Sequence, residues 1–166
     1  MSNTHHYRAS VSWDGNTGDG TRTYSSYSRS YRIEIEDKLP LHGSADPHFR
    51  GDPQRHNPED LLLAALSACH MLTYLALCSR NGIDVEAYTD DAAATMLLRE
   101  DGGGAFREAI LRPCVTVADE ASIDRARELH ETAHRLCFIS QSVAFPVTIE
   151  PTFTLAALSS QGEVDV

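Results

Sequence analysis

The stretch Asn57–Gly82 limits the possible folds of this chain more than any other, because a long apolar run lies between signals that start and end a helix. Asn57 offers a side-chain oxygen as N-cap, and Pro58 has the φ angle of a first helical position. Gly82 readily takes the left-handed conformation that ends helices. The leucines and alanines between them cover nearly every angle of a helical wheel. This pattern predicts a central helix that is buried on all sides.

Composition restricts the class of protein. The chain has 166 residues, of which 42% are hydrophobic and 23% charged, as in ordinary soluble domains. Its net charge of -10 excludes a basic nucleic-acid surface and argues against binding to an anionic membrane. The apolar run is about as long as a short membrane span, but its polar residues and caps favour a soluble helix. No signal peptide is recognisable, so we expect a cytoplasmic protein.

Alternating apolar and polar residues predict short strands on both sides of the helices. The expected order, βββ–α–ββ–α–β, indicates the α+β class. We expect a single domain over residues 1–166, with a core at about 7–155 and a polar, disordered tail at 159–166. Because so small a domain cannot cover an all-apolar helix alone, we expect a homodimer. The expected strands are 7–13, 21–26, 31–36, 85–98, 105–118 and 147–155, and the second helix is 122–137.

Four cysteines are present, and none of them forms a CxxC motif, which argues against a zinc ribbon or a thioredoxin motif. Without an export signal, the thiols are expected to be reduced. Cys69 in the central helix and Cys137 at the end of the second helix are the candidates for reactive thiols. For both, the alternative of an inert core cysteine stays open. Cys78 and Cys114 are interpreted as structural.

A reactive thiol needs a nearby cation or a helix N-terminus that lowers its pKa. The long connection 38–56, which we expect to lack secondary structure and to be functional, supplies Arg50 and Arg55. Glu59 could orient such an arginine. On an unbroken helix, Glu59 and Cys69 are separated by about 15 Å of rise. Either the helix is broken near its start, or Glu59 acts on the thiol of another subunit.

The histidines do not predict a metal site. His130 and His134 have the spacing of two zinc ligands on a helix, but no third ligand is evident, and an exposed polar face explains them better. His70 points about 100° around the helix from Cys69, which makes it a poor direct base, although it could line the same cavity.

The residues NPEDLLLAALSACHMLTYLAL resemble a signature of the OsmC/Ohr family, the osmotically inducible and organic hydroperoxide resistance proteins. In that family an N-P-E helix start precedes the peroxidatic cysteine by ten residues, here Glu59 and Cys69. A second signature, C-x-x-S-x-x-[LV], matches the segment from Cys137 through Ser140 to Val143. An early W-x-G at Trp13 also fits, and the resemblance covers about residues 7–155.

The resemblance implies an OsmC-like fold, in which two central helices are wrapped by antiparallel sheets in an intertwined homodimer. It also implies a peroxiredoxin-like hydroperoxide reductase without metal or organic cofactor. Cys69 would attack the peroxide and become a sulfenic acid, and Cys137 would resolve it as a disulfide. Glu59 would hold the arginine that stabilises the thiolate. A dithiol, such as a dihydrolipoyl protein, would reduce the disulfide.

One departure from the family pattern concerns the catalytic arginine. The turn after the first strand reads Asp14-Gly15-Asn16-Thr17-Gly18, where one branch has G-G-R. The other branch has an R-F-x-G element before N-P-E, which here reads His48-Phe49-Arg50-Gly51. Arg50 is therefore the leading candidate, with Arg22 and Arg55 as weaker ones. The departure also supports an alternative, namely an OsmC-like dimer with weak or no peroxidase activity that binds a small apolar ligand in the interface cleft.

Overall fold

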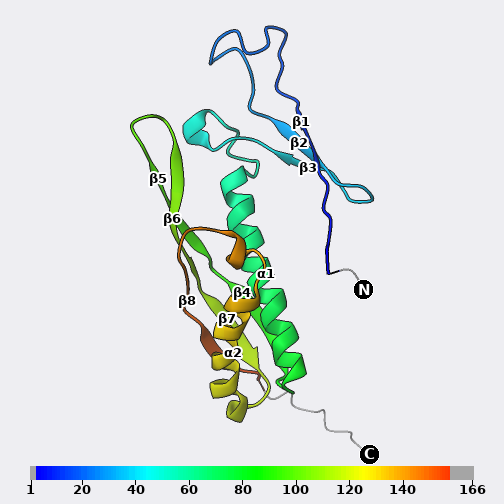
Figure 1. The fold of residues 1–166 in the computed structure, drawn as a ribbon, viewed down its shortest axis with the longest axis vertical. Helices are drawn as coiled ribbons and strands as arrows, with labels where there is room; N and C mark the ends of the chain where they lie inside the picture. Colours follow the sequence, from blue (N-terminus) through cyan, green and yellow to red (C-terminus); the bar gives the residue numbers. More distant parts are fainter. Residues whose placement is uncertain (1–2, 158–166) are drawn as a thin grey trace, which may run out of the picture. The chain divides into compact units, whose positions relative to one another are not determined.

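A computed structural model describes residues 3–157 of the chain, and the polar tail predicted for 159–166 lies outside the described residues. The described part has two α-helices and nine short strands in three sheets, with both antiparallel and parallel pairs (Figure 1). This architecture confirms the predicted α+β class. The chain divides at Leu62 into two compact units, and each is described by itself.

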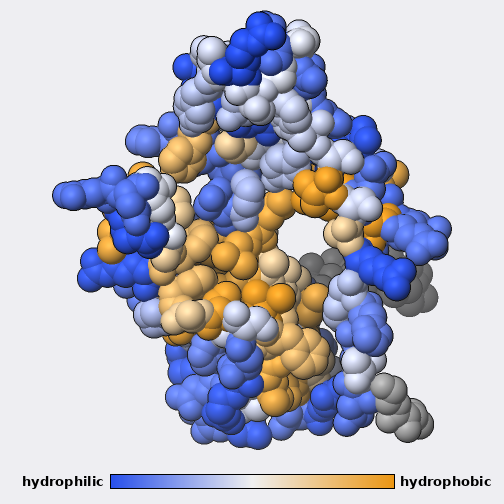
Figure 2. Space-filling model, turned by 45° about the horizontal axis from the view of Figure 1, so that its top comes forward, coloured by the Kyte–Doolittle hydropathy of each residue, from blue (hydrophilic) through white to orange (hydrophobic). Residues whose placement is uncertain are grey.

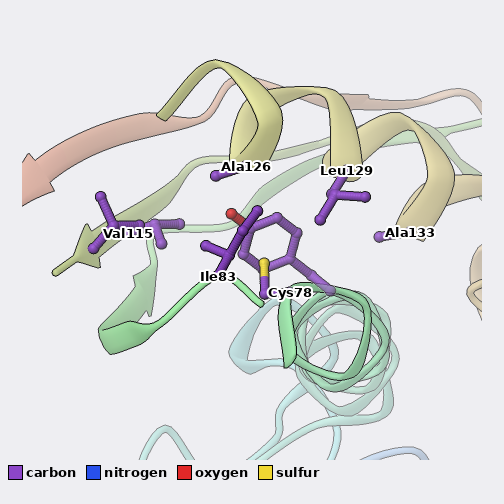
Figure 3. Close-up of a cluster of buried hydrophobic side chains, with 8 residues drawn as sticks. Cys78, Ile83, Val115, Ala126, Leu129 and Ala133 are labelled. Atoms are coloured by element: carbon purple, nitrogen blue, oxygen red, sulfur yellow. The ribbon is translucent and has the colours of Figure 1, made fainter. Parts of the chain in front are cut away.

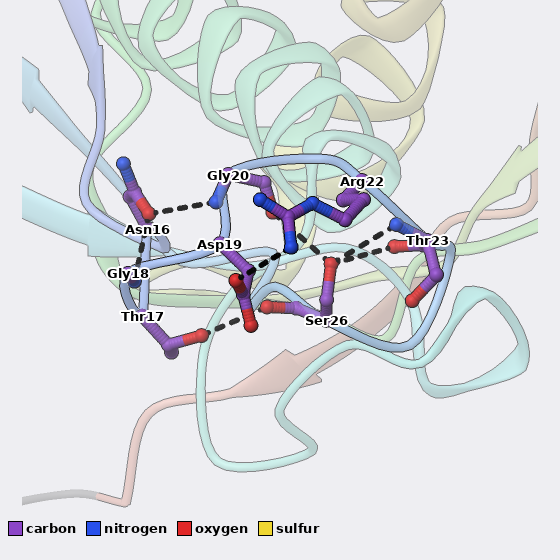
Figure 4. A network of polar contacts seen from close by, with 8 residues as sticks. All are labelled: Asn16, Thr17, Gly18, Asp19, Gly20, Arg22, Thr23 and Ser26. Carbon is purple, nitrogen blue, oxygen red and sulfur yellow. Dashed lines mark hydrogen bonds and ion pairs between the residues drawn. The ribbon is translucent and has the colours of Figure 1, made fainter.

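Unit 1 contains an antiparallel sheet in the order β1-β2-β3. Two of its strands confirm the predicted ones, but the strand predicted at 21–26 is wrong. Figure 4 shows that this segment belongs to a polar loop, in which the Asn16 side chain accepts hydrogen bonds from the backbone N–H groups of Gly18 and Gly20. Polar side chains that bond to nearby backbone compete with strand pairing. The strands are β1 (Ser10–Trp13), β2 (Tyr31–Glu34) and β3 (Leu41–Gly43).

The connection 38–56 has secondary structure, contrary to our expectation. It contains β3 and a short 3-10 helix, η1 (Pro47–Phe49), which is capped by the Asp46 side chain. Ser44 is buried, and its hydroxyl accepts a hydrogen bond from the N–H of Asp52 at 3.0 Å. A side chain at Gly51 would collide with the carbonyl of Ala45. The connection is therefore a compact, folded segment.

Helix α1 (Pro58–Arg80) begins and ends where the sequence predicts. Asn57 Oδ1 accepts a hydrogen bond from the N–H of Asp60 at 2.7 Å, and the Asp60 carboxylate accepts the N–H of Asn57 at 3.2 Å. This reciprocal arrangement is a capping box with aspartate in the usual place of glutamate. Gly82 has φ 69°, as expected for the residue that ends the helix.

Within a single chain α1 is buried on one face only, which agrees with the expectation that so small a domain cannot cover the whole helix; burial of the other face by a second copy stays a prediction. Leu66, Tyr74 and Cys78 are fully buried, but Leu72 is 63% exposed. The apolar residues around Leu72 are exposed as well in the described part of the chain. By length and composition α1 could also cross a membrane, but core helices meet the same criterion, and one face of α1 packs into unit 2. The exposed residues on this face are Ala64, Ala65, Ala68, Leu72 and Ala76.

Unit 2 has two mixed sheets, in the orders β4-β7-β9 and β5-β6-β8. Three segments that the sequence predicts as single strands each divide between these sheets. A hairpin joins β5 to β6. Pro113 begins β7 at the point of division, and Asp90 holds this point by accepting the N–H of Arg112 at 2.7 Å. The strands are β4 (Val85–Asp90), β5 (Ala93–Leu98), β6 (Gly104–Leu111), β7 (Pro113–Val117), β8 (Val147–Ile149) and β9 (Thr152–Leu155).

Helix α2 (Ile123–Leu136) confirms the predicted second helix, with the 3-10 helix η2 (Glu120–Ser122) before it. Its apolar stripe packs on α1 and on β7. Figure 3 shows Leu129 and Ala133 of α2 directed toward Cys78 of α1. A second cluster forms around Leu66 with residues of β6. The chain continues from α2 into a further 3-10 helix, η3 (Ser140–Ser142).

Candidate functional site

The thiols of Cys69 and Cys137 lie near each other in the folded chain. Cys69 lies in the middle of α1, at the border between its buried and exposed faces, and is partly exposed. Cys137 is the first residue after α2 and is completely buried. The Cys69 side chain is among the groups that raise the pKa of Cys137, which places the two thiols near each other. Neither thiol takes part in a disulfide.

The surroundings of Cys137 favour its protonated form. Burial, followed by the hydrogen bond to Cys69, raises the pKa of Cys137 to about 11. The backbone N–H groups of Ser140 and Ile139 act in the opposite direction, and the Ser140 N–H lies 3.4 Å from the sulfur. At neutral pH Cys137 is therefore a thiol, with two donors already in place for a thiolate.

The turn after Cys137 is fixed by hydrogen bonds to the end of α2. His134 Nδ1 lies 2.9 Å from Ser140 Oγ, and the side-chain amide of Gln141 donates to the carbonyl of His134 at 3.2 Å. The N–H of Gln141 donates to the carbonyl of Cys137 at 3.0 Å. The motif serine thus has two roles here: its backbone contacts the thiol and its side chain contacts α2.

A buried pair of histidines lies beside this turn and was not predicted. His70 Nε2 is 3.0 Å from His130 Nδ1, so one of the two nitrogens donates to the other. The His130 ring stacks on Tyr74 with ring centres 3.9 Å apart. Burial lowers the pKa of His70 to about 4 and that of His130 to about 3, so both rings are neutral at pH 7.

The expectation that His130 lies on an exposed polar face is therefore wrong, since His130 is only 3% exposed. Its spacing could have revealed this. His130 follows Ala126 by four residues and precedes Ala133 by three, so it falls within the apolar stripe of α2. His134 is partly buried. Among residues 3–157 no group of three His, Cys, Asp or Glu side chains could hold a metal ion.

Unit 1 has a cavity of about 740 Å³ that Glu59 lines together with Arg29 and aromatic residues. The negative charge of Glu59 reaches Tyr31, whose pKa is raised first by burial and then by Glu59 and Asp60. The remaining lining is largely apolar, and includes Trp13, Tyr27, Tyr31, Ile33, Phe49 and Leu61. Glu59 therefore faces a cavity suited to an apolar molecule.

Arg29 is the arginine of this cavity, and sequence reasoning did not identify it. Its guanidinium donates to the carbonyls of Tyr27 and Tyr24, each at 2.6 Å, and lies 4.1 and 4.2 Å from the centres of their rings. These contacts hold the charge in one position. No sequence signal marks Arg29, because its place depends on how the loop 16–30 folds.

The three predicted arginines have different surroundings. Arg50 is exposed at the end of η1 with φ 65° and does not line the cavity, although its neighbour Phe49 does. Arg22 pairs with Asp19 at 3.4 Å in the exposed loop of Figure 4. Arg55 pairs with Asp52 at 3.4 Å. The role assigned to Arg50 stays a prediction.

α1 is continuous from Pro58 to Arg80, which removes one of the two alternatives for Glu59 and Cys69. The helix is not broken near its start. Their separation along its axis is about 15 Å, more than an arginine or glutamate side chain spans. If Glu59 serves a Cys69 thiol, the remaining alternative is the thiol of another subunit.

Comparisons with known proteins show the family of the chain. Residues 51–152 match the family of OsmC-like proteins. The chain is 26% identical over 150 residues to the uncharacterized protein YmaD of Bacillus subtilis, a match that covers 88% of this chain and 91% of that protein.

Solved structures give the same result. An OsmC-like protein of unknown function from Vibrio cholerae superposes with a TM-score of 0.79 at 29% identity, covering 89% of this chain and 99% of that chain. An organic hydroperoxide resistance protein from Elizabethkingia anophelis has a TM-score of 0.66 at 20% identity, covering 94% and 100%, and so shares the fold. From the matched residues, the fold and the two cysteine motifs, we conclude that the chain belongs to the OsmC-like protein family.

Proposed function

We propose that this protein is a cysteine-based thiol peroxidase that reduces organic hydroperoxides or hydrogen peroxide. The observation that carries the proposal is that Cys69 lies near enough to Cys137, a residue far away in the chain, to raise its pKa. The Cys69 thiolate attacks the terminal peroxide oxygen and the O–O bond breaks. An alcohol or water leaves after taking up a proton, and Cys69 becomes a sulfenic acid.

The unequal surroundings of the two thiols support this order of events. Cys69 is partly exposed, so a peroxide can reach it, whereas Cys137 is completely buried. The high pKa of Cys137 keeps it a thiol while Cys69 reacts. Cys137 then attacks the sulfenic sulfur, and a disulfide and water form. A dithiol of the dihydrolipoyl type would restore both thiols, and a reducing compartment such as the cytoplasm suits this cycle.

We also propose that the active form is a homodimer. The distance along α1 supports this, because Glu59 would serve the Cys69 thiol of a second copy. The apolar face around Leu72 supports it too, since monomeric soluble proteins rarely expose large contiguous apolar surfaces. Figure 2 shows hydrophobic residues gathered in the centre of the visible face, with hydrophilic residues around them.

Two arginines compete for the role of stabilising the Cys69 thiolate. Arg50 matches the family pattern in sequence, whereas Arg29 lines the same cavity as Glu59 and is held by two carbonyls and two rings. Substituting each arginine by methionine shows which of the two stabilises the Cys69 thiolate. The variant that lowers the second-order rate of Cys69 oxidation by roughly tenfold or more, as expected on losing a preorganised charge, identifies the functional residue.

Mass spectrometry after one equivalent of cumene hydroperoxide tests the proposal. We expect a Cys69–Cys137 disulfide in the wild type, and in Cys137→Ser a sulfenic acid on Cys69 that dimedone traps. The matched control is Cys114→Ser, which removes a half-buried thiol of β7 and should oxidise like the wild type. A wild-type protein that stays fully reduced would contradict the proposal.

The cavity of unit 1 favours a second candidate function, the binding of a small apolar ligand without peroxidase chemistry. Its aromatic lining and its single arginine would suit a ligand with an apolar body and one polar group. In this case Cys69→Ser leaves binding of an aromatic fluorescent probe intact, whereas Trp13→Ala weakens it. Loss of probe binding in Cys69→Ser would count against the second candidate.

A further inference from the structure

The turn that follows α2 sets the position of the buried thiol. Cys137 closes the helix through its N–H, which donates to the carbonyl of Ala133 at 2.8 Å. Its sulfur faces the Ser140 N–H at 3.4 Å. A backbone N–H stabilises a nearby thiolate only while the turn keeps that N–H directed at the sulfur. The geometry of residues 137–140 therefore affects how readily Cys137 gives up its proton.

His134 holds this turn from α2 through two contacts. Its ring nitrogen Nδ1 bonds the Ser140 hydroxyl at 2.9 Å, and its carbonyl accepts the Gln141 side chain at 3.2 Å. Ser140 is 8% exposed, so its hydroxyl has little access to water as an alternative partner. Loss of the imidazole leaves this hydroxyl without its partner.

The titratable and charged groups around His134 come from both helices. On α1, His70 is close enough that the charge of His134 contributes to lowering the pKa of His70, after the larger effect of burial. On α2, His130 and several charged side chains share a groove with His134, and β8 together with Pro151 adds only apolar residues to it. The groove encloses about 450 Å³, and the residues that line it are Arg127, His130, Glu131, His134, Arg135, Val147, Ile149 and Pro151.

We propose that His134 is a positioning residue for disulfide formation: through Ser140 it holds the turn in which the Ser140 N–H faces the sulfur of Cys137. This inference rests on the proposed peroxidase function and concerns its second step. In that step the S–H bond of Cys137 and the S–O bond of the Cys69 sulfenic acid break. The S–S bond forms, and the released proton and hydroxide combine as water. His134 touches neither sulfur and is not consumed.

The experiment measures how the Cys69 sulfenic acid divides between two fates. Full-length protein receives one equivalent of cumene hydroperoxide in the presence of dimedone, and mass spectrometry gives the ratio of dimedone adduct to Cys69–Cys137 disulfide. The variants are His134→Leu, Ser140→Ala and His134→Asn. Leucine removes the hydrogen bond at similar volume, alanine removes only the hydroxyl partner, and asparagine keeps a polar nitrogen or oxygen near the place of Nδ1.

We expect His134→Leu and Ser140→Ala to raise the adduct-to-disulfide ratio by roughly 3- to 10-fold, the equivalent of one hydrogen bond. His134→Asn should stay within roughly twofold of the wild type, because it restores the bond to Ser140. The rate of the first step, measured as loss of free Cys69 thiol, should be the same in all four proteins. If His134→Leu does not fold, Ser140→Ala and His134→Asn still decide the question.

Two other results would overturn the inference. If the wild type forms the disulfide and His134→Leu and Ser140→Ala give the same adduct-to-disulfide ratio as the wild type, His134 does not position the turn. If His134→Asn raises the adduct-to-disulfide ratio as much as His134→Leu does, the hydrogen bond to Ser140 is not the cause of the effect. A wild type that forms neither adduct nor disulfide overturns the proposed function itself, so the two failures are distinguishable.

Discussion

One face of α1 carries Leu66, His70, Tyr74 and Cys78, and the opposite face carries Ala65, Ala68, Leu72 and Ala76. The first set is buried within a single chain, whereas the second is exposed. Of the two faces, the buried one carries the polar groups, since the imidazole of His70, the hydroxyl of Tyr74 and the thiol of Cys78 are packed away from water. The exposed face is hydrocarbon alone.

The comparison shows that hydropathy does not decide which face of this helix packs inside the chain. His70 is buried because His130 offers it a hydrogen bond at 3.0 Å and Tyr74 fills the adjoining space. This hydrogen bond offsets part of the cost of burying the two rings, although His70 Nδ1 and His130 Nε2 have no hydrogen-bond partner among the described residues. The other face has no such partners, and its side chains need a second surface that is equally apolar, which a homodimer would provide.

The largest effect is expected on the buried face. Leu66→Ala should lower the free energy of unfolding by about 2–5 kcal/mol, because Leu66 is 1% exposed and packs against Ala109 and Leu111. Urea denaturation followed by circular dichroism measures it. A loss below about 1 kcal/mol would mean that the cavity collapses or that Leu66 is less well packed than described.

The histidine pair should make stability depend on pH. In the unfolded chain both rings take up protons below about pH 6.5, whereas in the folded protein burial lowers the pKa values to about 4 and about 3. The unfolded state therefore binds more protons, so stability falls as the pH drops from about 6.5 toward about 4, by up to a few kcal/mol.

Urea denaturation at several pH values tests this expectation, with His130→Phe as the variant. Phenylalanine keeps the stacking on Tyr74 but cannot titrate, so the slope of unfolding free energy against pH should become smaller. The control is His42→Gln, which removes an exposed histidine of β3 and should leave the slope unchanged. Equal slopes in the wild type and His130→Phe would show that the buried pair does not titrate as described.

Asn57 caps the start of α1 and belongs to neither face. The variant Asn57→Ala therefore tests how much the helix cap contributes to stability, apart from the packing of either face. It removes the acceptor of the Asp60 N–H, a 2.7 Å hydrogen bond, and should cost about 1 kcal/mol. Asn57→Ser is the matched control, because serine caps as well and should restore most of the loss. A serine variant as unstable as the alanine variant would point to the buried position of Asn57 rather than to its cap.

The ends of α1 could be predicted because caps are local chemistry: Asn57, Pro58 and Gly82 act within one turn of the chain. The division of the strands could not, since the alternation of residues continues through Arg112 while the pairing changes sheet. His130 could have been predicted from its spacing in α2. Arg29 could not, because its contacts are carbonyls and rings of an irregular loop.

The candidate site was predictable to a similar degree. Spacing and motif identified Cys69 and Cys137 as candidates, and in the fold Cys69 lies near enough to Cys137 to raise its pKa. The contact of Ser140 with His134 was not foreseen, since it joins a helix side chain to a turn whose path the sequence does not specify. Candidate residues within one helix could be identified from the sequence, whereas contacts between different elements could be seen only in the fold.

The smallest effect is expected on the exposed face, where Leu72→Ala tests whether a second copy covers it. In a monomer, truncation of a side chain that is 63% exposed should change the free energy of unfolding by about 0.5 kcal/mol or less. In a dimer the same change should weaken association, so its effect should grow with protein concentration. Sedimentation velocity and thermal melting over a hundredfold range of concentration measure both. Leu97→Ala, an exposed leucine of β5, is the matched control. If Leu72→Ala and Leu97→Ala behave alike at every concentration, no second copy packs on this face, and Glu59 then has no partner thiol to serve.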